Sequence, residues 1–595
     1  MAETACVGAE GRQLVLFEVG RREVTVAFDG GQVVTDTGLL AVRQLDRRLG
    51  VLAEAAARLP DPRSELLRQF STEDLLTQTV YQLLGGDFDC NDAQTLRHDP
   101  LMQVLLDQVP GQEEATLASG STLARFRYAF TRRQRNVPVN ERTIDQECQA
   151  AKCRRLRELN RYLVELFVKT RTTPPQRIVL DIDATDDPAH GQQQLTLFHG
   201  YYRQNQSLSR LVFDGESKFP LTGWLGIGTA HPSWGAVESL GELVTAWRAA
   251  WPEVEILIRA DGGYASPSLY EWCEALKLQY VIGYSTNNTL VGQTEVTMNH
   301  ARAKAALYDE PCQLFQDIRD YQAGSWDRPR RVIAKCEVTQ QGGPNRRFVV
   351  TNLTDPAAHV CRQVYVKRGD AERAIEELKH GLAIDRLSSH RFFANAFAMP
   401  CHLLAYALFT LFREANADVP AVAQHTLETI RARVFKVGAV FQSTTRKIWF
   451  HASATWPGQA VFEQTSAAVN AFANRFGRLW DDRLIQGLTQ RLGGPVTITL
   501  AAATPHQMTR AQHGSPSVVP PKVRAETAKI PANRPQNTPR PRSAPPQPAR
   551  PPTPPTNLKL GAKTTRRCAI RANLGLPRWG VNPKQSKFKM HASGW

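Results

Sequence analysis

Arg177-Ile-Val-Leu-Asp181-Ile-Asp183-Ala-Thr185-Asp186-Asp187 is an apolar stretch that leads directly into a cluster of four acids. It predicts a buried strand, and α/β folds place their chemistry at strand ends. A second apolar stretch, 254–260, ends at Asp261 with two glycines directly behind it. Glycines at such a place let a backbone or a phosphate approach closely. The two stretches therefore predict two strands that carry carboxylates at their ends.

The segments around these strands follow a definite order. Strands are expected at 195–202, 211–213, 219–226 and 280–284, and helices at 233–250 and 268–276. A three-strand meander followed by helix, strand, helix and strand resembles a ribonuclease H-like α/β domain, whose first part we expect over residues 141–284. In that architecture two carboxylates from strand ends meet a third from a later helix. Such acceptor-only groups can hold two hard cations about 3.5–4 Å apart.

A later stretch supplies a candidate for the third carboxylate. It reads Tyr365-Val-Lys-Arg368-Gly-Asp-Ala-Glu372-Arg-Ala-Ile-Glu376-Glu-Leu-Lys379. If the whole stretch is one helix, with about 100° of turn per residue, four side chains fall within an arc of roughly 60°. They are Tyr365, Arg368, Glu372 and Lys379. The cations and the hydroxyl can clamp phosphate oxygens while the carboxylate holds a divalent metal. The alternative is a solvated amphipathic helix laced with ion pairs four residues apart.

The charge of the chain is concentrated at its C-terminal end. The 595 residues carry a net charge of +16, and from Ala501 onward 17 Lys and Arg stand against the single acid Glu526. The preceding residues hold 56 of each sign and balance. Residues 501–595 are also rich in proline, so we expect a disordered, basic tail. It is either a nonspecific phosphate-binding arm or translated sequence beyond the natural end of the protein, and we prefer the second interpretation.

Several other classes of protein are disfavoured. Ten Cys are scattered without a CxxC pair, which indicates neither a zinc site nor a disulfide framework and favours a reducing cytoplasm. No signal peptide and no Gly-rich nucleotide-binding loop is visible, so we expect no nucleotide cofactor. The stretch 393–412 is nearly uncharged, but Asn395, Pro400 and His402 interrupt it. A buried helix is therefore expected there rather than a membrane span.

The first 140 residues are expected to form a separate helical region that binds DNA. Helices are predicted at 39–52 and after Ser71-Thr-Glu-Asp74, which is a capping-box pattern. The segment 122–135 interleaves five Arg with three aromatic residues, and such a segment can dock along a DNA groove. An ordinary amphipathic helix with a wet basic side is the alternative. The candidate DNA-binding residues here are Arg125, Arg127, Arg132 and Arg133.

Residues 285–345 do not fit the rhythm of the α/β domain, and we expect a β-rich insertion there. A strand is predicted at 331–339, with Trp326 in a loop just ahead of it. The α/β domain resumes in a second part at 346–412, and 413–500 forms a C-terminal region.

Six segments give the chain a wider resemblance. They are Asp29-Gly-Gly through Leu39-Leu40, Leu96-Arg-His-Asp99, Leu180-Asp-Ile-Asp-Ala-Thr-Asp-Asp, Arg259-Ala-Asp-Gly-Gly-Tyr, Val281-Ile-Gly-Tyr and Glu377-Leu-Lys-His-Gly-Leu. Together with the spacing Tyr-x2-Arg-x3-Glu-x6-Lys, they resemble DDE-type bacterial insertion-sequence transposases with a Tyr-Arg-Glu-Lys signature, in the insertion sequence 1380 group. The resemblance runs from about Phe28 to Phe476.

The resemblance implies a role for each matching residue. The catalytic metal ligands would be Asp183, Asp261 and Glu372. Asp183 is chosen because the family pattern has a Thr two positions after the first Asp, and Thr185 stands there. The three carboxylates would bind two Mg²⁺ ions, for which Mn²⁺ may substitute. The DNA backbone would be positioned by Tyr365, Arg368 and Lys379. Some of these transposases stack an aromatic of the insertion on a flipped base, and Trp326 is the candidate, with a loop Trp that covers a hydrophobic edge as the alternative.

Two positions have competitors, and one segment departs from the family pattern. Asp181 shares a strand face with Asp183, and Glu376 lies near the helical stripe of Glu372. Either competitor could instead be a supporting or solvated carboxylate. The chain reads Arg-Ala-Asp-Gly-Gly around Asp261 where the family suggests Arg-Gly-Asp-Ser-Gly, which raises the possibility of a decayed copy.

The function implied by the resemblance is cut-and-paste DNA transposition. The enzyme would bind terminal inverted repeats as a homodimer, nick with water, form a hairpin through the 3′-hydroxyl and join the element to target DNA. Its place would be the cytoplasm, at the nucleoid, with no membrane partner. Two alternatives stay open, namely a decayed DNA-binding protein that represses its own element and a repair or host nuclease on the same fold.

Overall fold

A nine-stranded mixed sheet organises the part of the chain that the structure describes. This structure is a computed structural model and describes residues 14–112, 116–128, 146–340 and 343–476, which lie in the first of the two units of the chain. The strands of the sheet are β4 (Arg177–Pro188), β5 (Leu197–His199), β6 (Gln204–Asp214), β7 (Pro220–Gly226), β8 (Glu255–Ala260), β9 (Gln279–Tyr284), β10 (Cys312–Tyr321), β11 (Arg330–Val338) and β12 (Pro344–Thr351). Their order is β10-β11-β12-β9-β8-β4-β6-β5, with β7 also paired to β6.

The two strands singled out in the sequence lie side by side in the middle of this sheet. β4 pairs in parallel with β8 on one side and antiparallel with β6 on the other. Helix α8 (Ala236–Ala250) follows the meander of β4, β6 and β7, and α9 (Pro267–Ala275) joins the parallel strands β8 and β9, which need a crossover. The predicted order of meander, helix, strand, helix and strand is confirmed. The strand predicted at 195–202 shortens to β5, and 211–213 is only the end of β6.

The segment predicted as a β-rich insertion needs a correction. Its first half forms two helices, α10 (Asn288–Gln293) and α11 (Glu295–Tyr308), and only its second half forms β10 and β11. Four alanines between residues 301 and 306 favour helix in α11. The strands extend the main sheet, because β11 pairs with β12 and β12 pairs with β9.

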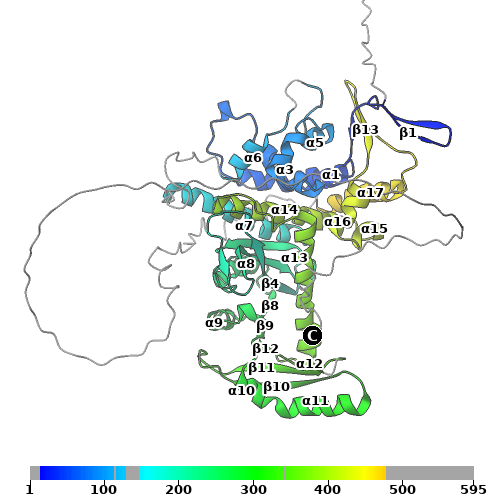
Figure 1. The fold of residues 1–595 in the computed structure, drawn as a ribbon. Helices are drawn as coiled ribbons and strands as arrows, with labels where there is room; N and C mark the ends of the chain where they lie inside the picture. The colour runs from blue at the N-terminus through cyan, green and yellow to red at the C-terminus, as the bar shows by residue number, and fades with distance from the viewer. Residues whose placement is uncertain (1–13, 113–115, 129–145, 341–342, 477–595) are drawn as a thin grey trace, which may run out of the picture. The chain divides into compact units, whose positions relative to one another are not determined.

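Two long helices pack on the meander side of the sheet, α7 (Gln146–Lys169) and α14 (Phe392–Ala415). Figure 1 shows both lying across the β4 end of the sheet, with α8 and α9 on one side of the strands and α13 (Gly369–Leu382) on the other. Among the described residues, α14 is the one helix apolar and long enough to cross a membrane, and 89% of its apolar window is buried inside the protein. The predicted buried helix is therefore confirmed.

The N-terminal residues form a short hairpin and a group of helices. The elements are β1 (Leu14–Val19), β2 (Arg22–Val26), α1 (Leu39–Leu49), α2 (Val51–Ala57), η1 (Glu65–Leu67), α3 (Thr72–Gly85), η2 (Cys90–Asp92), α4 (Ala93–Leu96), α5 (Pro100–Leu105) and α6 (Gly120–Arg127). The predicted capping box begins α3, because the Asp74 amide donates to Ser71 Oγ at 3.0 Å and the Ser71 amide donates to Asp74 Oδ2 at 2.7 Å.

A second sheet joins the two ends of the described chain. Its strands are β3 (Val33–Val34), β13 (Ala439–Ser443) and β14 (Ile448–Ala452), in the order β14-β13-β3. The remaining elements are α12 (Ala357–His359), η4 (Val360–Val364), η5 (Tyr365–Arg368), η3 (Gly262–Tyr264), α15 (Pro420–Ala423), α16 (Leu427–Ile430), η6 (Arg431–Phe435) and α17 (Gln459–Phe476). The predicted tail, 501–595, and the candidates Arg132 and Arg133 lie outside the described residues.

Candidate active site

Three elements bring the three predicted carboxylates together beside the middle of β4, where β8 ends. Asp183 lies in β4, and Asp261 directly follows β8, each one residue beyond the register pair Ile182–Ala260 of these parallel strands. Glu372 comes from the first turn of α13, which packs against β4. Residues far apart in the sequence thus meet where the sequence predicted.

The turn behind β8 fixes Asp261. Its side chain accepts a hydrogen bond from the Gly263 amide at 2.9 Å and caps the short turn η3. A Cβ added at Gly262 would meet nothing closer than 3.7 Å, and this residue has no positive φ. A serine would therefore fit at position 262, and the departure from the family pattern there leaves the turn unchanged.

Arg368 lies among the three carboxylates. Its Nη1 donates to Asp183 Oδ2 at 3.1 Å, and its Nη2 donates to Glu372 Oε1. Burial raises the pKa of Asp183 to about 7, and the charge of Asp261 adds to this shift. Burial also raises the pKa of Asp261, against the opposing effect of Arg368. For Arg368 itself, burial lowers the pKa, but the charge of Asp183 and its neighbours more than offsets this and raises it. One guanidinium therefore balances this acidic cluster.

The carboxylates of Asp183, Asp261 and Glu372 are suitable ligands for a hard divalent cation. In this structure the Arg368 guanidinium occupies the space between Asp183 and Glu372. In the described ranges no group of three or more His, Cys, Asp or Glu side chains is arranged to hold a metal ion. Carboxylate oxygens are the ligands that Mg²⁺ and Mn²⁺ prefer. Asp183 and Asp261 are buried near each other with Glu372, and a divalent cation would offset the charge of such a cluster. The residues therefore fit such an ion once Arg368 moves aside.

Asp181, the competitor of Asp183, has a different partner. Arg259 donates to both of its carboxylate oxygens at 2.6 Å, and both side chains are buried. Arg259 also donates to the Val364 carbonyl at 3.0 Å, which ties β8 to the segment just before η5. A carboxylate already paired in this bidentate way is a poor metal ligand, so the geometry favours Asp183 for the first position.

The predicted single helix from Tyr365 to Lys379 is wrong in its first turn. A π-helical turn, η4, leads into the tighter 3-10 turn η5, and α13 starts only at Gly369. Tyr365 is just 6% exposed, and burial raises its pKa to about 12. Its ring lies 6.0 Å from the Arg368 guanidinium, and only a glycine fits at position 283, because a Cβ there would lie 2.6 Å from the Tyr365 hydroxyl. The buried Tyr365 ring therefore packs against the Arg368 guanidinium and helps to position it.

Lys379 is paired further along α13. Its Nζ lies 2.9 Å from Asp186 Oδ1, and Gln204 Nε2 donates to the other oxygen of this carboxylate at 2.9 Å. Burial by itself would raise the pKa of Asp186. The hydrogen bond from Lys379 outweighs this effect, and the pKa is lowered below its usual value. Glu376, the competitor of Glu372, is exposed to solvent. The helix therefore presents Glu372, and not Glu376, to the strand carboxylates.

Asp187 is a second buried acid, and sequence reasoning missed the half-buried Asp385 whose charge acts on it. Asp187 is 4% exposed, and its Oδ1 has no hydrogen-bond partner in the part of the chain that the structure describes. Burial, followed by the charge of Asp385, raises its pKa to about 8. The sequence marked Asp187 as part of an acidic cluster, but nothing in it pointed to Asp385.

Trp326 is not available to a DNA base in this structure, which corrects its predicted role. It is 6% exposed, and its ring centroid lies 5.6 Å from Tyr270, 5.3 Å from Tyr284 and 5.5 Å from Tyr321. The Arg330 guanidinium lies 5.6 Å from the same ring. Since stacking needs an open ring face, the alternative of a Trp that covers a hydrophobic edge describes Trp326 better.

The two described Arg candidates of the N-terminal region differ. Arg125 is exposed and donates to Thr122 Oγ1 at 3.0 Å, so its guanidinium is accessible to DNA. Arg127 is half-buried, and its Nε is buried with no hydrogen-bond partner among the described residues. Its charge lowers the pKa of the buried Cys401, whose burial has the larger, opposite effect. Arg127 therefore faces the interior.

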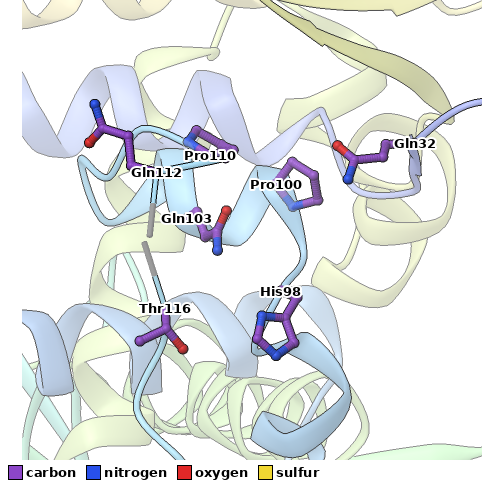
Figure 2. A pocket seen from close by; sticks show the side chains of 8 residues that line it. Gln32, His98, Pro100, Gln103, Pro110, Gln112 and Thr116 are labelled. Atoms are coloured by element: carbon purple, nitrogen blue, oxygen red, sulfur yellow. The ribbon is translucent and has the colours of Figure 1, made fainter. Parts of the chain in front are cut away.

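A hollow in the N-terminal region contains none of the predicted site residues. Its volume is about 300 Å³, and Figure 2 shows His98 and Thr116 facing Pro100 and Gln103 across it. The remaining lining residues are Gln32, Pro110, Gly111 and Gln112. None of its described lining residues carries a carboxylate, so the candidate chemistry stays with the cluster around Asp183.

Comparisons with known proteins identify the family. No curated protein matches the chain. Among solved structures, a piggyBac transposase synaptic complex with hairpin DNA is 12% identical and covers 80% of this chain and 89% of that chain, but its TM-score of 0.33 supports no argument here. The family model described as transposase DDE domain group 1 matches residues 17–474, well over half of the chain. The chain therefore belongs to the transposase DDE domain group 1 family, which makes it a transposase with DNA as its substrate.

Proposed function

We propose that the chain catalyses cut-and-paste transposition of a bacterial insertion sequence of the 1380 group through a ribonuclease H-like core. The observation that carries this proposal is the meeting of Asp183, Asp261 and Glu372 around one guanidinium. The strand order β7-β6-β4-β8-β9, antiparallel in the meander and parallel from β4 to β9, supports the core. The Tyr-Arg-Glu-Lys signature supports the group.

The three carboxylates are proposed to hold divalent cations, two Mg²⁺ ions for which Mn²⁺ substitutes. When bound, such ions activate the attacking water or 3′-hydroxyl and stabilise the leaving oxygen of an in-line displacement. Asp261 is preset for this role by its bond from the Gly263 amide, and Glu372 by the start of α13. The buried Asp181–Arg259 pair holds the Val364 carbonyl and so keeps the turn that carries Arg368 in place.

The cations of α13 and η5 are proposed to position the DNA backbone. Arg368 is free to bind a phosphate oxygen when it leaves Asp183, because a planar guanidinium binds phosphate as readily as carboxylate. Lys379 bonds to Asp186, three residues beyond Asp183 in β4, and extends this surface, while Tyr365 acts through Arg368. The DNA would be the terminal inverted repeats and the target, and two copies of the chain would pair the two ends, at the nucleoid in the cytoplasm.

Cleavage of a duplex that carries the sequence flanking this gene tests the proposal. With Mg²⁺, the wild type is expected to nick the 3′ end and then form a hairpin, and Glu372→Gln is expected to lose both steps by about a hundredfold or more. Glu376→Gln is the matched control, because this residue lies four positions further on the same helix and is exposed. It should cleave as the wild type does.

Other outcomes favour the alternatives. Specific binding to the flanking sequence without cleavage by any variant would favour a decayed DNA-binding protein. Cleavage that depends on Glu372 but ignores the terminal sequence would favour a nuclease of another role. Equal loss in Glu372→Gln and Glu376→Gln would contradict the assignment of the third carboxylate.

A further inference from the structure

Two exposed aromatic residues flank the carboxylate cluster and are not explained by the core. Tyr201 is 81% exposed in the turn between β5 and β6, and Trp234 is 52% exposed in the loop between β7 and α8. Single exposed aromatics are ordinary on protein surfaces. These two differ because both side chains contact neighbouring residues and both loops are attached to the segments that carry the site.

The β5–β6 turn is built to project Tyr201. The Arg203 amide donates to the His199 carbonyl at 2.7 Å, and Arg203 takes a φ of +57°, a conformation that residues with a side chain rarely adopt. Tyr201 meets Tyr202 edge to face, with ring centroids 5.0 Å apart. The exposed ring is therefore supported by its neighbour, and the turn ends in an exposed cation.

The same turn is attached to the acidic end of β4. Gln204, one residue after the turn, donates to Asp186 Oδ2 at 2.9 Å. Burial and then the charges of Asp186 and Asp183 raise the pKa of Tyr202 to about 12, so its ring lies within electrostatic reach of both acids. The turn that carries Tyr201 is thus attached to β4 three residues beyond Asp183.

Trp234 has a partly exposed indole that packs on a buried arginine. One face of its indole lies over the buried Arg210, whose guanidinium is 5.8 Å from the ring centroid. Arg210 is itself fixed, because it donates to the Pro232 carbonyl at 2.9 Å and to the His231 carbonyl at 2.8 Å. The indole therefore rests on a buried, hydrogen-bonded guanidinium while about half of its surface stays open to solvent.

The loop of Trp234 lies against the turn that carries Asp261. A Cβ added at Gly263 would lie 3.1 Å from Pro232 Cγ, so the two segments are in close contact. The loop also joins the β5 side, because the Gly228 amide donates to the Leu195 carbonyl at 3.2 Å. Tyr201 and Trp234 therefore belong to two connected loops, one next to the end of β4 and one next to the end of β8.

We propose that Tyr201 and Trp234 form a stacking site for unpaired nucleobases of the DNA strand whose phosphate lies at the carboxylate cluster, an inference that rests on the proposed function. Every base has a π-face, so rigid, open aromatic rings hold unpaired bases of any sequence. Arg203 adds a cation at the tip of the same turn. A base-paired duplex offers no free face to such rings, so the site selects distorted or single-stranded DNA next to the cleaved bond.

Binding of the full-length protein to two oligonucleotides tests this proposal. One is a fully paired repeat end and the other has two unpaired bases at the same end, with 2-aminopurine as the fluorescent base. EDTA keeps cleavage out of the measurement. Tyr201→Ala and Trp234→Ala are each expected to weaken binding of the unpaired form about tenfold and of the paired form less than about twofold. The 2-aminopurine quenching seen with the wild type should be lost.

Matched controls and a second set of variants keep the test decisive. Tyr308→Ala and Trp449→Ala remove aromatics that are 67% and 45% exposed elsewhere, and should leave both affinities unchanged. Trp234→Phe should retain stacking, whereas Trp234→Leu, which keeps apolar surface, should lose it. Unchanged quenching in Tyr201→Ala and Trp234→Ala, or equal losses on paired and unpaired DNA, would overturn the proposal. These results are independent of cleavage by the wild type, whose absence would count against the proposed function alone.

Discussion

At the scale of single residues, Arg368 is the side chain on which the site depends. It bonds to Asp183 and Glu372, which the proposed function assigns to a metal ion. A guanidinium and a divalent cation cannot occupy the same space between two carboxylates. Under the proposed function, Arg368 therefore competes with the metal ion and, once displaced, would bind a phosphate oxygen.

Arg368→Gln should raise the affinity of the DNA-free protein for Mn²⁺, on the order of tenfold, because charge-assisted hydrogen bonds to the carboxylates no longer have to break. Isothermal titration calorimetry measures this affinity. Arg373→Gln is the control, since its side chain is 82% exposed on the same helix. Weaker Mn²⁺ binding in Arg368→Gln would show that the guanidinium supports the cation site instead of competing for it.

Asp187 should make the stability of the protein depend on pH. Its pKa is raised to about 8 by burial and Asp385, whereas an unfolded Asp titrates near 3.9. The folded state therefore binds the extra proton, and stability falls as pH rises from about 4 to about 8. Asp187→Asn should flatten this fall and be more stable than the wild type by about 2 kcal/mol or more at pH 9, in urea titrations. A less stable variant at pH 9 would contradict this account.

At the scale of elements, Glu274 of α9 joins the strands of the insertion to the core. It accepts from Arg330 Nε at 2.9 Å and from the Tyr280 hydroxyl at 2.8 Å, and it also pairs with Arg328. Arg330 begins β11, and Tyr280 lies in β9. One carboxylate thus connects a helix with two strands that are not neighbours in the sheet.

Glu274→Gln should destabilise the protein by about 1–3 kcal/mol at neutral pH, because it weakens several charge-assisted hydrogen bonds at once. Burial by itself would raise the pKa of Glu274. The hydrogen bonds from Arg330 and Arg328 outweigh this effect and lower the pKa to about 2. Its contribution is therefore present above the unfolded pKa of about 4.3 and is lost as pH falls towards 2. Chemical denaturation at pH 7 and pH 3 measures both effects. Glu271→Gln, exposed on the same helix, should change neither, and equal effects of both variants would refute the role of Glu274.

Sequence patterns predicted the elements of the core better than their boundaries. The strands β4, β8 and β9 and helices α8 and α9 were found because apolar runs and helical spacing are local signals. The change from 3-10 turn to α-helix at Gly369 was missed, since both forms place residues three or four apart on one side. The segment just before this change also makes a tertiary contact that no local pattern reveals, the Arg259 bond to the Val364 carbonyl.

The candidate site shows the same division. The family resemblance, carried over residue by residue, selected Asp183, Asp261 and Glu372, whereas residue patterns alone left Asp181 and Glu376 as competitors. The pairing of Asp181 with Arg259 and the burial of Trp326 could not be predicted, since both depend on side chains from other elements. The position of Arg368 between carboxylates is likewise a property of the folded chain.

At the scale of the whole molecule, segments near the two ends of the described chain pack against each other. β3 pairs with β13, with Val34 opposite Ala439. Gln44 donates to the Asn470 side chain at 2.8 Å, so α1 lies against α17. Arg431 donates to the Leu84 carbonyl of α3 at 2.8 Å. The N-terminal helices therefore rest on residues that follow α13 by tens of positions.

A fragment of residues 1–140 should consequently not fold alone, because it lacks the segments that cover α1 and α3. Circular dichroism and limited proteolysis of the fragment are expected to show little helix and rapid cleavage. Residues 1–476, which retain α17, should resist proteolysis and serve as the control. A stable, helical 1–140 fragment would contradict this dependence and favour an independent N-terminal domain.

The position of a bound metal ion tests the central claim most directly. Crystals of the protein with Mn²⁺ and a repeat-end DNA should show an anomalous scattering peak about 2–2.6 Å from oxygens of Asp183 and Asp261, with Glu372 beside it. Arg368 should have moved from Asp183 to a phosphate oxygen, and Glu372→Gln should weaken the peak. A peak at Asp181 or Asp187 instead, or undiminished metal occupancy in Glu372→Gln, would contradict the account.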